Sequence, residues 1–193
     1  MTTIPPPEPP KIEVIENYHP NGKLKEKGIL GNGKKDGFWD TWYENGKKKI
    51  QGNWKNGKKD GLITSWYKNG HKKTVGFYKD DKLDGFFTQW YENGKIELEG
   101  TFKDKKEDGV VTTWYQNGQK HFEGMYNDGK KEGLHTEWYE NGQKMSSLTY
   151  KGGKSNGLVT TWYENGKKEF EGTSKDHKLI NLKKWNEDGS VKE

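Results

Sequence analysis

The chain consists of one 24-residue unit that is repeated without insertion. The copy at 85–108 reads GFFTQWYENGKIELEGTFKDKKED. Its Trp90-Tyr91 pair and its Asn93-Gly94 pair recur at intervals of 24 residues. A fixed period of this length is typical of stacked arrays, in which each unit buries its apolar surface against the next. The repeat therefore limits the fold more than any other feature of the sequence.

The period also defines the domain organisation. A proline-rich segment at 1–11 holds five of the six prolines and is expected to be an extended, disordered tail. Residues 12–193 are expected to form the repeat domain. Its units are 13–36, 37–60, 61–84, 85–108, 109–132, 133–156 and 157–180, with a partial unit at 181–193.

Each unit is expected to be a β-hairpin. Aromatic, aliphatic and Thr residues at 85–91 suit a strand, and the return strand follows the Glu-Asn-Gly turn. In the first copy Pro20 precedes Asn21-Gly22. Proline fits the second position of a type I turn, but in a two-residue loop it would remove a ladder donor. We therefore expect a three-residue loop that pairs Tyr91 with Lys95, while the turn between units remains open.

A regular ladder continued from this loop predicts which residues share a face. Pairs on one face would be aromatic and aliphatic, and glycines would leave room beside the large rings. The expected pairs are Trp90 with Ile96, Thr88 with Leu98, and Phe86 with Gly100, with Phe102 on the same face. The predicted fold class is all-β, an elongated single-layer antiparallel β-meander of hairpin repeats.

Two aromatic rows follow from this register. The structural row, expected to pack along the sheet, is Trp42, Trp66, Trp90, Trp114, Trp138 and Trp162. The opposite face is the candidate partner-binding face, because Tyr buries area while keeping a polar tip. It carries Tyr43, Tyr67, Tyr91, Tyr115, Tyr139, Tyr163, Trp39, Phe87 and His135, together with Ile63, Val111 and Val159. The alternative is that these rings only shield the sheet backbone from water.

Composition disfavours a conventional core and an enzyme. A hydrophobic content of 27% with 33% charged residues resembles a disordered chain, but 13% aromatic residues in strict phase can order a stack. The chain has no alanine, which disfavours helix, and no cysteine, which excludes thiolate metal sites. The five histidines occupy different positions of the repeat and lack ligand spacing. We expect no catalytic residues, no metal and no cofactor.

The net charge of +5 rests on 34 lysines without any arginine. Arginine is the usual bidentate reader of guanine, so sequence-specific nucleic-acid binding is not expected. One lysine per unit, from Lys34 to Lys178, could attract an anionic membrane. Acidic residues two positions later, from Asp36 to Glu132, largely cancel that charge, so membrane binding is not favoured. No signal peptide or transmembrane segment is apparent, and the cytoplasm is the default location.

The repeated motif WYENGKKxxEGxYKxGKKDG resembles the MORN-type repeat, in the variant that occurs in bacterial proteins known as YwqK-family antitoxins. The resemblance covers residues 13–193. It implies a twisted single-layer antiparallel sheet that serves as a scaffold for protein contacts and has no shared catalytic residues. The partner would be a protein, and a toxin if the chain is an antitoxin. A phospholipid-binding adaptor and a self-associating part of a larger assembly are the alternatives.

Overall fold

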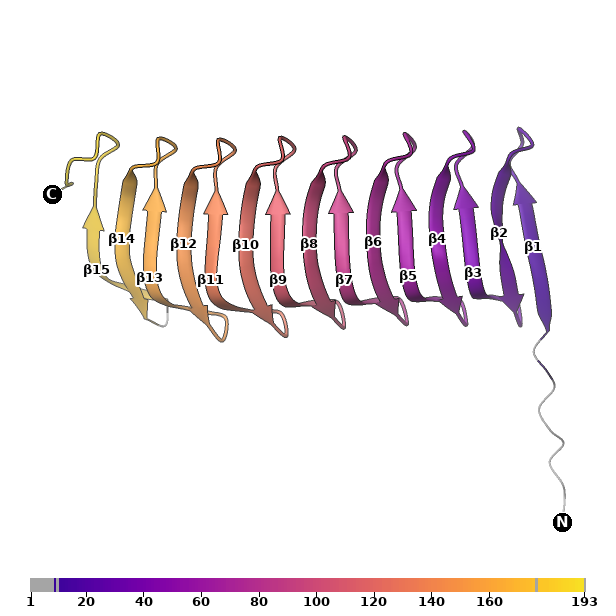
Figure 1. The fold of residues 1–193 in the computed structure, drawn as a ribbon. Coiled ribbons are helices and arrows are strands. Elements are labelled where there is room, and N and C mark those ends of the chain that lie inside the picture. Colours follow the sequence, from indigo (N-terminus) through magenta and orange to yellow (C-terminus); the bar gives the residue numbers. More distant parts are fainter. Residues whose placement is uncertain (1–8, 10, 176, 193) are drawn as a thin grey trace, which may run out of the picture. The chain divides into compact units, whose positions relative to one another are not determined.

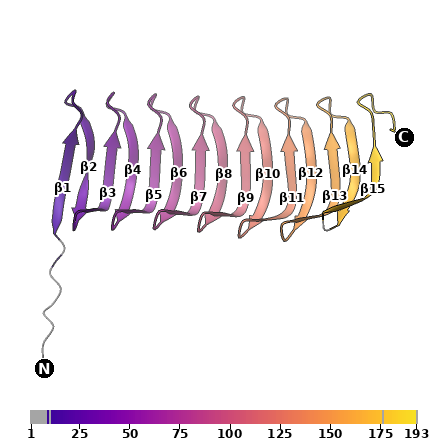
Figure 2. The ribbon, with the colours of Figure 1, turned by 180° about the vertical axis from the view of Figure 1, so that it is seen from behind.

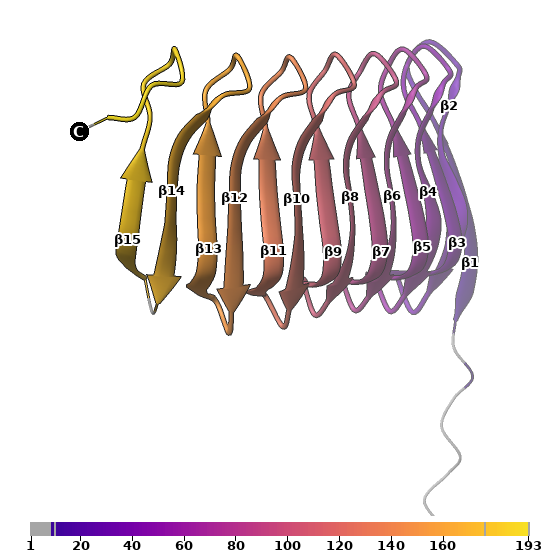
Figure 3. The same cartoon turned by 60° about the vertical axis from the view of Figure 1, so that its left-hand side comes forward.

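The computed structural model describes residue 9 and residues 11–175 and 177–192. In this part of the chain every helix or strand assigned is a β-strand, and the strands follow one another in chain order as an antiparallel meander (Figure 1). Figure 3 shows the strands of each unit as one layer, with no other element over either face. The predicted all-β meander of hairpins is confirmed.

The chain divides into two compact parts, each made of several 24-residue repeats. The part that ends at Lys82 is called the first unit below, and the part that begins at Leu83 is called the second unit. The first unit contains β1 (Ile12–Tyr18), β2 (Leu24–Gly31), β3 (Lys34–Trp42), β4 (Lys48–Lys55), β5 (Lys58–Trp66) and β6 (Lys72–Lys79). The second contains β7 (Lys82–Trp90, from its second residue), β8 (Ile96–Lys103), β9 (Lys106–Trp114), β10 (Lys120–Asn127), β11 (Lys130–Trp138), β12 (Lys144–Lys151), β13 (Lys154–Trp162), β14 (Lys168–Lys175) and β15 (Lys178–Lys184).

The Glu-Asn-Gly loops have the predicted three-residue form. The Tyr91 amide donates to the Lys95 carbonyl at 2.8 Å, and the Gly94 amide donates to the Tyr91 carbonyl at 2.9 Å. Gly94 has a φ of 86°, in the left-handed region that favours glycine. Within each unit these loops lie together at one end of the strands, the upper end in Figures 1 and 2.

The turns at the other end contain two residues. Lys103 pairs with Lys106 across Asp104-Lys105, which have φ values of 50° and 74°. Two successive left-handed residues define the type I′ turn, whose twist matches that of the flanking strands. The structure therefore settles the turn type that the sequence left open.

A β-bulge beside each three-residue loop shifts the ladder by one residue. Trp90 pairs with Ile96 as predicted, but the next pair is Gln89 with Leu98. Glu97 is therefore an extra residue in β8, without a partner opposite it. Every Glu-Asn-Gly-type hairpin repeats this shift, and the extra residues are Lys25, Lys49, Lys73, Glu97, His121, Met145 and Glu169. We call these seven residues the bulge row.

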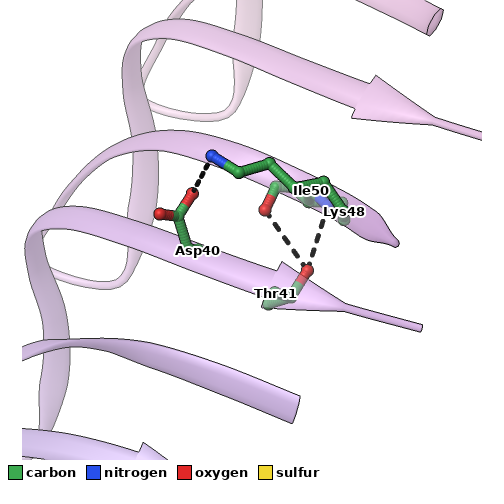
Figure 4. A network of polar contacts seen from close by, with 4 residues as sticks. All are labelled: Asp40, Thr41, Lys48 and Ile50. Atoms are coloured by element: carbon green, nitrogen blue, oxygen red, sulfur yellow. Dashed lines mark hydrogen bonds and ion pairs between the residues drawn. The ribbon is translucent and has the colours of Figure 1, made fainter. Parts of the chain in front are cut away.

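Figure 4 shows the bulge between β3 and β4. Lys48 reaches across to Asp40, with 3.5 Å between Nζ and Oδ1. Thr41 Oγ1 accepts a hydrogen bond from the Ile50 amide at 3.1 Å, so the ladder resumes at that pair. Lys49, between Lys48 and Ile50, is the residue that the bulge inserts.

The bulge makes the predicted register wrong beyond the first pair. Phe87, and not Phe86, lies opposite Gly100. The prediction assumed a regular ladder, and a shift of one residue moves every later side chain to the other face of a sheet. Accordingly, Phe86 is 46% exposed, although the regular ladder places it on the packed face.

The more buried face is therefore the one with the glycines, which we call the glycine face. In the first unit its core is Trp39, Trp54 and Ile63, of which Trp39 is 2% and Ile63 3% exposed. Val111, His135 and Val159 are the buried equivalents of Trp39 and Ile63 in the second unit. These side chains share a face with the Tyr row, as predicted. They lie over the glycines, so they pack against the sheet.

Candidate functional site

The tyrosine row of the glycine face forms hydrogen bonds between successive repeats. Five of its phenols donate to the carbonyl of the tryptophan in the following hairpin, and Tyr91 reaches Trp114 at 2.6 Å. The other bonds are Tyr43 to Trp66, Tyr115 to Trp138, Tyr139 to Trp162 and Tyr163 to Trp185, at 2.7 to 2.9 Å. Partial burial, followed by nearby carboxylates, raises the pKa of Tyr115. These phenol hydroxyls, which the sequence suggested for contact with a partner, therefore form hydrogen bonds within the sheet.

The asparagines of the loops add a second set of bonds between repeats. Asn117 Oδ1 accepts from the Gln119 amide of its own loop, and Asn117 Nδ2 donates to the Glu140 carbonyl of the next, both at 2.8 Å. Asn21, Asn45, Asn93, Asn141 and Asn165 make the same pair of bonds. Because these six loops are each tied to the next, insertion of a residue between them would break two sets of bonds. These contacts explain the strict period.

Replacing Tyr115 with phenylalanine is expected to destabilise the protein by about 1–2 kcal/mol, because the half-buried Trp138 carbonyl loses its donor. Tyr126→Phe is the matched control, since the described structure gives the Tyr126 phenol no hydrogen bond; the expected change is within about 0.5 kcal/mol. Urea denaturation followed by far-UV circular dichroism measures both. Equal losses in the two variants would contradict a role for the bond.

Two hollows occupy equivalent places on the glycine face, one in each unit. The first has a volume of 330 Å³ and is lined by Lys49, Lys59 and Lys73 around Ile50 and Ile63. We call it the lysine hollow. Each ammonium lies beside a ring: Lys49 Nζ is 5.6 Å from the centre of Tyr43, and Lys59 and Lys73 make similar contacts to Tyr78 and Tyr67.

The second hollow, of 400 Å³, lies two repeats further along the sequence and is lined by Glu97, His121 and Glu137 beside Phe122 and Tyr126. We call it the glutamate hollow. Glu97 accepts a hydrogen bond from Gln89 Nε2 at 2.8 Å. The two hollows have the same architecture and opposite charge, because the bulge residues change from lysine in the first unit to glutamate and histidine in the second.

The sequence interpretation did not single out the bulge row as a candidate site. The row was hidden because a bulge residue does not follow the strand alternation used to assign faces. One signal was readable: the third residue after each Asn-Gly changes from Lys25, Lys49 and Lys73 to Glu97 and His121. That change has no structural explanation in the loops, which have the same hydrogen bonds throughout.

The structural tryptophan row lies half-buried on the face opposite the glycines. Lys48 Nζ is 5.9 Å from the centre of Trp66, and Lys120 Nζ is 5.2 Å from that of Trp138. Trp162 has the same contact with Lys144. The prediction of an aliphatic residue opposite the tryptophan holds for Trp90 and Ile96. In the hairpins of Trp66, Trp138 and Trp162 the opposite residue is a lysine, which offers an aliphatic stem.

His135, predicted for the partner-binding face, is only 4% exposed in this structure. Its ring lies between those of Phe122, Tyr126 and Tyr150, with centres 4.8 to 5.6 Å away. Nε2 donates to the Met125 carbonyl at 2.8 Å, and Nδ1 has no partner. Burial lowers the pKa of the imidazole, which favours the neutral ring.

Neither a metal site nor a membrane span is found in the described part of the chain. No group of three or more His, Asp or Glu residues there could hold a metal ion. None of its segments is a helix both long and apolar enough to cross a bilayer. What the site offers chemically is an open aromatic surface with localised charge.

Comparison with protein families agrees with the repeat geometry. Residues 14–29, 36–56, 59–80, 83–104, 107–128, 131–151 and 155–176 match the MORN repeat variant. No curated protein matches the chain. The matched segments together cover more than half of the sequence, and each covers most of the two strands of one hairpin with the loop between them. The chain belongs to the MORN repeat variant family.

Proposed function

We propose that this chain is a non-enzymatic scaffold that binds a protein partner on its glycine face. The observation that carries the proposal is the pair of open hollows, of 330 and 400 Å³, on a face that no other described element covers. Half-buried aromatic side chains line both hollows. Tyrosine and phenylalanine supply large contact area at low entropic cost, and they are enriched at protein interfaces.

A toxin is the specific partner that the resemblance to bacterial antitoxins suggests. A neutralising protein needs a tight, stoichiometric complex, and a rigid preformed surface lowers the entropic cost of forming one. The bonds between repeats made by the Tyr and Asn rows support such rigidity. The toxin-neutralising role is therefore the first one to test.

Membrane binding by the lysine margin is the less favoured alternative. Lys58 pairs with Asp80 of the next turn, with 3.7 Å between Nζ and Oδ1, and Lys106 pairs with Asp128 at 2.7 Å. These exposed pairs contribute little to stability. They do lower the positive charge that the margin offers to an anionic surface.

The test is isolation of the chain at native expression level, followed by measurement of complex stoichiometry. We expect one protein partner at a fixed ratio. Ser65→Arg and Thr113→Arg, which fill the two hollows, are expected to abolish the complex. Leu62→Arg and Val110→Arg, on exposed positions of the opposite face in the same strands, are the matched controls and should retain it. Failure to isolate a complex, or its equal loss in both pairs of variants, would refute the proposal.

A further inference from the structure

We propose that the lysine hollow and the lysines of the bulge row bind an acidic polypeptide segment in the polyproline II conformation, with a carboxylate at every third residue. This inference rests on the proposed scaffold function and specifies the chemistry of the partner. It concerns the first unit alone. Four observations support it: the direction of the bulge lysines, the lack of carboxylate partners for their ammonium groups, their spacing, and the different charge of the second unit.

The bulges insert three lysines into the return strands of the first unit, and two of these lysines are directed toward the glycine face. In each hairpin one lysine has no residue opposite it. It lies between the last paired residues beside the loop and the next paired residues of the two strands. These lysines are Lys25, Lys49 and Lys73. Bulges commonly re-aim a side chain in this way. Lys49 and Lys73 both line the lysine hollow, so their side chains point to the glycine face.

The lysines in the hollow lack carboxylate partners. No described carboxylate lies within 4.0 Å of the ammonium group of Lys49, Lys59 or Lys73, although the ammonium groups of other lysines form such pairs. The Asp81 carboxylate, which lies near Lys59, accepts from the main-chain amide of that residue at 2.8 Å. The three ammonium groups instead lie over tyrosine rings. A carboxylate from outside would complete their hydrogen bonding, and apolar atoms beside it would lie near Ile50 and Ile63.

Two acidic residues lie near the lysines of the first unit: Glu44 lines a neighbouring hollow together with Lys49, and the charge of Glu26 acts on Lys35. Burial lowers the pKa of Lys35, and the charge of Glu26 is a smaller effect in the opposite direction. Lys35 Nζ lies 4.3 Å from the centre of the Trp39 ring and 5.5 Å from that of Trp54. The Lys35 ammonium therefore adds to the positive charge of the glycine face. The carboxylates of Glu26 and Glu44 do not balance the charges of Lys35, Lys49, Lys59 and Lys73.

The spacing of the bulge row fits a polyproline II helix. Neighbouring strands lie about 4.8 Å apart, so equivalent residues of successive hairpins are roughly 10 Å apart. Polyproline II rises about 3.1 Å per residue with three residues per turn, or roughly 9 Å per turn. One carboxylate per turn would thus meet Lys25, Lys49 and Lys73 in succession. In an extended β-strand, residues three apart point to opposite sides and could not do so.

The positive charge of the bulge row is confined to the first unit and is not a property of every repeat. At the positions of Lys49 and Lys73, the glutamate hollow has Glu97 and His121. Its glutamates would repel the same ligand. An acidic segment would therefore select the first unit, although both units offer the same aromatic framework.

Fluorescence anisotropy of labelled peptides with the full chain tests the proposal. The peptide (Glu-Pro-Pro)₄ is expected to bind about tenfold more tightly than (Gln-Pro-Pro)₄, and the difference should shrink at high salt. A peptide of the same composition with its four glutamates in one block should bind more weakly. Equal binding of the block peptide or of the neutral peptide would overturn the proposal.

Charge reversal locates the site. Lys49→Glu with Lys73→Glu is expected to weaken binding of (Glu-Pro-Pro)₄ at least about tenfold. Lys55→Glu with Lys79→Glu changes the same net charge at exposed ends of the same two strands, and should have little effect. Conversely, Glu97→Lys with His121→Lys should create a second binding equivalent. Equal weakening by both reversals would indicate a diffuse charge effect and overturn the site.

The same variants separate this inference from the scaffold function. If the native partner complex is lost in Ser65→Arg but persists in Lys49→Glu with Lys73→Glu, and no acidic peptide binds, the scaffold function stands and the acidic ligand is refuted. If the acidic peptide binds as expected but no native complex exists, the scaffold function is refuted and the site stands.

Discussion

Replacing Gly52 with alanine is expected to destabilise the first unit by about 3 kcal/mol. A β-carbon at this position would overlap the carbonyl oxygen of Leu62 and lie 2.5 Å from Ile63 Cδ1. Neither atom can move cheaply, because one is backbone and the other belongs to a side chain buried in the core. The cost therefore exceeds the gain of about 0.5–1 kcal/mol that alanine would otherwise bring by restricting the unfolded chain.

Gly100→Ala is the matched control at the same position of the repeat. There the β-carbon would lie 3.0 Å from Val111 Cγ2 and 3.3 Å from the Phe102 ring. Both neighbours are side chains that can shift, so we expect a loss of about 1 kcal/mol or less. Urea denaturation monitored by tryptophan fluorescence and circular dichroism compares the two. A Gly52 variant as stable as the wild type would contradict the close approach.

Local rules made the hairpins predictable from the sequence. The period located the Asn-Gly loops of the hairpins, and Pro20 in the first loop favoured a three-residue turn, because a proline cannot donate to a ladder. The structure confirms that loop in the hydrogen bond between Tyr91 and Lys95. These features depend on residues close together in the chain, where turn chemistry and strand propensity agree.

The faces could not be predicted in the same way, because the bulge leaves little trace in composition. Phe86 and Phe87 are both aromatic, so either register gives an apolar row beside Gly100. The glycine was correctly interpreted as room for a ring, but the ring was assigned to the wrong neighbour. What decides the register is an extra residue, Glu97, which has no residue opposite it in β7.

The candidate site was only partly accessible to sequence reasoning. The sequence identified the Tyr row but not the hydrogen bonds of its phenols. These phenols donate to main-chain carbonyls of the next repeat. Every residue has a main-chain carbonyl, so the residue type does not reveal the acceptor. The turns at Asp81 and Lys105 were likewise not predictable from residue type. Both residues have φ values above 60° without being glycine, because the ladder on either side imposes the turn.

His135 should make the stability of the second unit fall in mild acid. Burial lowers the pKa of its imidazole in the folded state, with a smaller contribution from Lys131, while the hydrogen bond to Met125 and the charge of Glu137 act in the opposite sense. Stability is therefore unaffected by this group above the unfolded pKa of about 6.5. It declines as pH falls below that value, by at most about 1.4 kcal/mol per pH unit, until the folded-state pKa is passed.

His135→Phe is the variant that isolates this contribution. Phenylalanine occupies the equivalent position at Phe87, and it would keep the ring contacts with Phe122 and Tyr150 while removing the unpaired Nδ1. Between pH 7 and pH 5 the wild type should lose about 1–2 kcal/mol more than this variant. His71→Gln, at an exposed loop position, is the control and should follow the wild type. Because a neutral enclosed imidazole must take up a proton on unfolding, parallel pH curves for wild type and His135→Phe would show that the ring is solvated.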